Sequence, residues 1–123
     1  MRTGTVSFNG KKHVLCFSVR VVKSCMERYG AMSGIYEALS TDDETKTLDE
    51  ALWILEQMMK AGSKYAEEHG LENEPPMTVE DMLDQCDLND FLNIRAAIIS
   101  TINNGKETRV KADSPNAEAT QGN

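Results

Sequence analysis

Hydrophobic and polar residues follow two different periods along this 123-residue chain. Near the N-terminus, two short β-like runs over residues 5–8 and 13–17, with Val14 and Cys16 two positions apart, flank the turn Asn9-Gly10-Lys11-Lys12. Asn-Gly is the strongest short signal for a β-hairpin because both residues tolerate positive φ. From Ser18 to about Asn104, apolar residues instead recur every three to four positions, as in amphipathic helices. The pattern predicts a mainly α protein (α+β), with an N-terminal β-hairpin packed on a bundle of about four to five helices.

Local signals set the expected helix boundaries. Ser18 and Gly30 delimit a first helix, and a short helical segment follows over residues 33–39. Thr47 opens the main helix with a capping-box pattern, and Gly70 ends it. Apolar residues cover nearly half the circumference of this helix, so we expect it at the centre of the core. A short helix beginning near Thr78 and a last helix over residues 88–103 complete the bundle.

The C-terminal segment has a different composition. Residues 105–123 contain one strongly apolar residue, Val110. Such a segment cannot bury enough surface to offset the entropy lost on ordering. We therefore expect residues 1–104 to form a single hairpin-plus-helical domain, with Gly105 ending the last helix, and residues 105–123 to form a disordered polar tail.

Charge is distributed unevenly. Residues 1–30 carry a net +5, residues 31–104 carry −12, and the tail is neutral, which gives the total of −7. An acidic body repels phosphate, and no apolar run reaches the roughly 20 residues that span a bilayer, so we expect neither nucleic acid nor membrane as a partner. The asymmetry favours head-to-tail self-association, docking to a charged partner, or a basic hairpin lying over the acidic helices of its own chain.

Chemistry-bearing residues do not group into a site along the sequence. Three cysteines form no CxxC pair, and His13 with Cys16 offers only two metal ligands. Neither a P-loop nor a dinucleotide-binding pattern occurs. The carboxylates of Glu80, Asp81 and Asp84 lack the ligand spacing and central glycine of a calcium loop. We expect no catalytic residue, metal or cofactor, and hence no enzyme.

Two residues interrupt the amphipathic pattern and suggest a surface for a partner. Trp53 falls on the polar face of the main helix, where either the loop over residues 40–46 covers it or it anchors a partner. Arg95 falls inside the apolar stripe of the last helix. It snorkels, pairs with an acid such as Asp84 or Asp87, or belongs to a face that receives a partner helix. The candidate partner-binding residues are Trp53, Phe91, Arg95, Ile98 and Ile102.

The order of these segments resembles a known family. The run Phe8-Asn9-Gly10-Lys11-Lys12 precedes Leu15-x-Phe17 and a basic-faced helix ending at Tyr29-Gly30. A long helix, the segment Met77-Thr78-Val79-Glu80-Asp81-Met82-Leu83-Asp84 and a terminal helix complete the layout. Over roughly residues 5–104, this layout resembles the tail assembly chaperones of long-tailed bacteriophages.

The resemblance implies a non-catalytic protein that binds the long, helical tape-measure protein and keeps it soluble until tail-tube subunits assemble around it. It also implies self-association, possible contact with the tail-tube protein, a location in the cytoplasm of the bacterial host, and absence from the mature virion. Two alternatives remain open. One is a small acidic adaptor or inhibitor that binds a host enzyme, and the other is a structural tail component retained in the virion.

Overall fold

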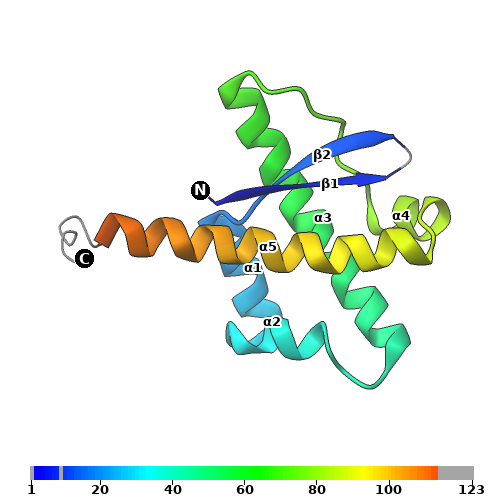
Figure 1. Cartoon of the computed structure of the whole chain (residues 1–123). Helices are drawn as coiled ribbons and strands as arrows, with labels where there is room; N and C mark the ends of the chain where they lie inside the picture. Colours follow the sequence, from blue (N-terminus) through cyan, green and yellow to red (C-terminus); the bar gives the residue numbers. More distant parts are fainter. Residues whose placement is uncertain (1, 9, 114–123) are drawn as a thin grey trace.

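The computed structural model describes residues 2–8 and 10–113, with side chains described as far as Gly105. The chain forms a hairpin followed by helices, in the order β1 (Thr3–Phe8), β2 (Lys11–Cys16), α1 (Val19–Tyr29), α2 (Ser33–Ala38), α3 (Glu44–His69), α4 (Val79–Gln85) and α5 (Leu88–Asp113) (Figure 1). This confirms the predicted mainly α fold with an N-terminal hairpin.

The hairpin has a tighter turn than the four residues we expected. Phe8 pairs with Lys11, so the connection consists of residues 9 and 10 alone. Gly10 has a φ of 71°, the left-handed conformation that a two-residue Asn-Gly turn requires. The two antiparallel strands are correspondingly longer, with Thr3 paired to Cys16 at the open end.

The core lies where α3, α5 and the hairpin meet. Figure 1 shows α5 crossing α3, with the hairpin beside the crossing. β2 packs on α3, and β1 packs on α5. The close approaches use glycine: Gly62 of α3 faces the backbone of β2, and Gly4 of β1 faces Thr101 of α5. The fully buried side chains at the centre include Leu15, Ile54, Leu55, Met58, Ile94, Ile98 and Ile102.

The outer edge of β2 is covered by the segment that follows α3. The Val14 N–H donates to Asn73 Oδ1 at 2.7 Å, and the Glu74 N–H donates to the Lys12 carbonyl at 3.2 Å. These bonds satisfy strand groups that would otherwise face solvent. An isolated two-stranded hairpin is marginal in water, so helix packing together with this edge cover holds it in place.

Most helix ends lie where their capping residues predict. Ser18 accepts the Val21 N–H, Gly30 and Gly70 are left-handed, and Thr78 begins α4 with a complete capping box. The expected start of α3 at Thr47 was wrong. Asp43 caps the helix one turn earlier by accepting the Lys46 N–H, because an aspartate is as good a cap as a threonine.

The expected end of the last helix at Asn103 was also wrong. Gly105 has no positive φ, and α5 continues through it to Asp113. A glycine inside a helix costs about 1 kcal/mol relative to alanine, which weakens a helix without ending it. Residues 114–123, on which the prediction of a disordered tail also falls, lie outside the described residues.

Candidate functional site

A surface groove opens where α3, α4 and the start of α5 meet. We call it the α3–α4–α5 groove; it is lined by Leu48, Leu52, Met82, Leu83, Cys86, Asp87, Leu88, Phe91 and Ile94. Its volume is about 220 Å³, below the roughly 300–1,000 Å³ typical of small-molecule pockets. Its lining is apolar except for Asp87. A site of this size suits a few side chains of a partner better than a metabolite.

Capping hydrogen bonds place the two walls of the groove. Met82 is fully buried and fixes α4 to the core. Cys86 then turns to an extended conformation, which ends α4. Asp87 and Asp90 exchange bonds across the start of α5, with the Asp90 N–H donating to Asp87 Oδ1 at 2.8 Å and the Asp87 N–H donating to Asp90 Oδ2 at 3.0 Å. The chain therefore bends sharply, and both helices contribute side chains to one groove.

Three leucines around the groove are exposed to solvent. Leu83 is 44% exposed, Leu88 is 75% exposed, and Leu92, one turn beyond Leu88 on α5, is 55% exposed. We call these three residues the leucine rim. Single exposed leucines are common, but apolar residues gathered beside an apolar groove are typical of an interaction surface.

The groove is bordered by negative charge. Residues 78–94 contain five carboxylates and no lysine or arginine; the carboxylates are Glu80, Asp81, Asp84, Asp87 and Asp90. Asp81, Asp87 and Asp90 accept capping bonds. Glu80 and Asp84 are exposed and lie one turn apart on α4. Within the described part of the chain, neither forms an ion pair, so both are available to a cation from outside.

Trp53 lies elsewhere, against the end of α1. The Arg28 guanidinium lies 4.4 Å from the centre of its ring, and Tyr29 meets it edge-on at 6.0 Å. Glu50 holds both neighbours, accepting from Arg28 Nε at 2.8 Å and from the Tyr29 hydroxyl at 2.6 Å. The hydrogen bonds from Arg28 lower the pKa of Glu50, and burial raises the pKa of Tyr29. Trp53 is thus half-buried under α1, a cover that sequence reasoning did not consider.

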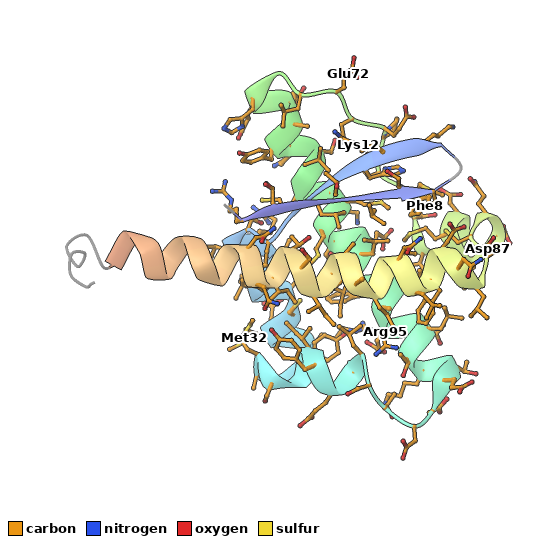
Figure 2. All side chains as sticks on the ribbon, in the orientation of Figure 1. Phe8, Lys12, Met32, Glu72, Asp87 and Arg95 are labelled. Carbon is orange, nitrogen blue, oxygen red and sulfur yellow. The ribbon has the colours of Figure 1, made fainter. Side chains whose placement is uncertain are left out.

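The predicted partner-binding stripe of α5 is divided in two. Ile98 and Ile102 are fully buried in the core with the hairpin, so they are not accessible to a partner. Phe91 is partly exposed and lines the groove. In Figure 2, Arg95 lies on the opposite side of α5 from Phe8. Among the described residues Arg95 forms no salt bridge, and its buried Nε has no hydrogen-bond partner, so the expected pairing with Asp84 or Asp87 is absent.

The structure thus brings together one predicted candidate, Phe91, with residues that sequence reasoning did not single out. Leu83 comes from the short helix before it, and Cys86 is the residue that ends that helix. A sequence signal for them existed: Asp87 and Asp90 have the spacing of a capping pair, which marks a second helix start directly after α4. The bend that this pair marks brings two apolar walls together.

The remaining candidates for reactive chemistry among the described residues are His13 and the cysteines. His13 is buried, and neither of its ring nitrogens has a hydrogen-bond partner in the described part of the chain; desolvation lowers its pKa. Burial raises the pKa of the Cys25 thiol to about 11 and also raises that of Cys86, so both thiols are protonated at neutral pH. The described residues contain no group of three or more potential ligands that could hold a metal ion.

Across residues 2–8 and 10–113, no helix combines the length and apolar character needed to cross a membrane. Comparison with protein-family models gives no match for this chain, and comparisons with curated proteins and with solved structures give none either.

Proposed function

We propose that this protein is a non-catalytic tail assembly chaperone that binds the tape-measure protein of a long-tailed bacteriophage. The observation that carries the proposal is the α3–α4–α5 groove with its leucine rim. The order of hairpin and helices, which resembles that family, supplies the client. The groove supplies a place where a helix of that client can dock.

Docking follows the helix-in-groove mode of peptide recognition. An amphipathic helix presents apolar side chains at positions i, i+3, i+4 and i+7, and a groove receives them in turn. Here Phe91 and Leu52 form part of the groove lining, while Leu83 and Leu88 stand at its sides. A docked helix removes these apolar side chains, and its own stripe, from water.

The groove predicts weak binding at each site. Burying one leucine contributes about 1.5–3 kcal/mol, whereas association costs on the order of 4–15 kcal/mol of lost freedom. Two or three anchors therefore give only a modest net affinity. Binding of many copies along one long client compensates for the weak affinity of each site. Self-association of the chaperone strengthens the overall binding further. Weak single sites also allow release when tail-tube subunits assemble, in keeping with a proposed role in the host cytoplasm and absence from the mature virion.

The first experiment is an affinity pull-down of the tagged chain from a lysate that expresses its native gene neighbourhood. We expect a very long, helix-rich protein to be recovered with several chaperone copies. The double variant Leu83→Ser/Leu88→Ser removes two exposed rim residues and should abolish recovery. Val19→Ser is the matched control, because Val19 is 84% exposed on α1 and does not line the groove. Circular dichroism serves as the check that both variants remain folded.

A second candidate function rests on the acidic border. A small acidic adaptor could present this border to a basic surface of a host enzyme. Recovery of one compact host protein at a one-to-one ratio would favour the adaptor and contradict the chaperone. Detection of the chain in purified particles would instead indicate a structural tail component.

A further inference from the structure

We infer that the α3–α4–α5 groove selects a basic amphipathic helix, one whose apolar stripe is flanked by lysine or arginine. The inference rests on the proposed function and names the chemistry of the client segment that the same groove takes. It follows from two independent properties of the groove: its apolar lining with the leucine rim, and the sign of the charge around it.

The apolar lining sets the shape of the ligand. Both walls are helical and meet at the bend around Cys86, so the groove is short and open to the surface. Leu83 lies on the α4 wall and Leu88 on the α5 wall. A continuous apolar stripe on a helix contacts both, whereas a polar extended peptide leaves the rim in water.

The acidic border sets the charge of the ligand. Glu80 and Asp84 lie one turn apart along α4, and Leu83 follows Glu80 by three residues, so all three share one side of the helix. Asp87 is itself one of the residues that line the groove. A docked helix therefore places its flanking residues beside two or three carboxylates. Lysine or arginine there is attracted, and glutamate or aspartate is repelled.

The expected discrimination is moderate. One exposed ion pair contributes up to about fivefold in affinity. Two or three pairs, together with the repulsion of an acidic ligand, give a preference on the order of tenfold to a hundredfold. Because the border is exposed, salt at about 1 M, where the screening length is about 3 Å, should remove most of it.

The protein carries its own reporter for occupancy of the groove. Cys86 lines the groove and is partly exposed, whereas Cys16 and Cys25 are buried. In alkylation at alkaline pH, followed by intact-mass measurement, Cys86 therefore reacts first. Alkylation of the two buried thiols would indicate that the protein has unfolded. A helix seated in the groove slows this reaction.

The probes are three synthetic helical peptides of equal length. The first carries leucine at i, i+3, i+4 and i+7 with lysine on both flanks, and the second has glutamate in place of every lysine. The third has the composition of the first, scrambled so that the leucines do not share a face. Affinities are measured by fluorescence anisotropy at low and high salt. We expect the lysine peptide to bind at least tenfold tighter than the other two and to protect Cys86.

Charge reversal on the protein gives the decisive comparison. Glu80→Lys/Asp84→Lys should reverse the preference, so that the glutamate peptide binds more tightly. Glu67→Lys/Glu68→Lys is the matched control: it makes the same change in net charge on exposed positions of α3 that do not line the groove, and it should leave the preference intact.

Three results would overturn the inference. They are equal affinity for the lysine and glutamate peptides, an unchanged preference in the Glu80→Lys/Asp84→Lys variant, and binding of the lysine peptide without protection of Cys86. A fourth is occupation of the groove by a second copy, whose α1 exposes Val19 beside Arg20. Sedimentation would detect this as self-association that Leu83→Ser/Leu88→Ser abolishes. Recovery of the long client without any charge preference would overturn the inference alone, whereas failure to recover that client would overturn the proposed function.

Discussion

Gly62 is the position where one added methyl group should do most damage to the fold. A Cβ there would lie 1.8 Å from the Val14 carbonyl oxygen, 2.5 Å from its carbon and 2.9 Å from the Leu15 Cα. All three atoms belong to the backbone of β2, so no side-chain rotation relieves the contact. Gly62→Ala therefore forces α3 and β2 apart.

The size of the effect follows from that displacement. Relieving a contact of 1.8 Å to about 3.2 Å moves the two elements by roughly 1.4 Å, and a gap of about 0.5–1 Å already forfeits a quarter to a half of the dispersion energy of the contacts that it opens. Overpacking of this kind costs typically about 1–3 kcal/mol and occasionally more. The better helix propensity of alanine returns about 1 kcal/mol. Because all three contacts are with backbone atoms, the overpacking cost lies at the upper end of this range, and we expect the free energy of unfolding to fall by about 2 kcal/mol, a large share of the roughly 5–15 kcal/mol typical of a domain.

Gly105→Ala is the matched control. Its Cβ would meet Phe17 Cδ2 at 3.5 Å, an ordinary contact, inside α5 and without a positive φ. This substitution should raise the free energy of unfolding by about 0.5–1 kcal/mol. Urea unfolding followed by circular dichroism measures both variants, with the slope against denaturant checked for two-state behaviour. A Gly62→Ala protein as stable as the parent would refute the close packing of α3 on β2.

Two further predictions concern buried polar groups. Desolvation holds the pKa of His13 in the folded protein below its ordinary value of 6.5. As the pH falls, His13 of the unfolded chain therefore becomes protonated before His13 of the folded protein does. The contribution of His13 to the free energy of unfolding should therefore be constant above about pH 6.5 and decrease below it. In the His13→Leu variant, the free energy of unfolding measured in urea should depend less on pH between about pH 7.5 and 5.5. An unchanged pH dependence would assign the effect to another group. Glu50→Ala removes the acceptor for two α1 side chains, and should lower stability by about 1–3 kcal/mol and red-shift the fluorescence of Trp53. Lys23→Ala, which breaks an exposed 3.7 Å pair, should stay within about 0.5 kcal/mol and leave the emission unshifted.

Features set by local chemistry could be predicted from the sequence. Asn9-Gly10 specifies a hairpin because few other residue pairs accept its backbone geometry. Gly30 and Gly70 end their helices in the left-handed conformation, and Thr78 begins α4 as a cap. Each signal depends on a few neighbouring residues, so no knowledge of the tertiary fold was needed.

Features that depend on contacts between residues far apart in the sequence could not be predicted in this way. Asp43 and Thr47 are both suitable caps for α3, and the choice depends on packing: Thr47 is buried, and its hydroxyl donates to the Thr41 carbonyl. Trp53 lies on the polar face in sequence, yet the end of α1, more than twenty residues earlier, covers it. Periodicity assigns a residue to a face of its own helix without saying which element packs there.

The divided stripe of α5 shows how the length of one element decides which apolar residues remain for a partner. β1 runs alongside α5 (Figure 1), with Gly4 against Thr101 near one end and Phe8 at the other. From Gly4 to Phe8 a strand rises about 13 Å, a distance that a helix spans in about nine residues. Cover by the hairpin therefore extends from Thr101 to about Leu92 and buries Ile94 and Ile98 between them. Leu88 lies beyond its reach on the same stripe, and the short helix α4 covers that end only partly. The groove thus opens beside the part of the stripe that a six-residue strand does not reach.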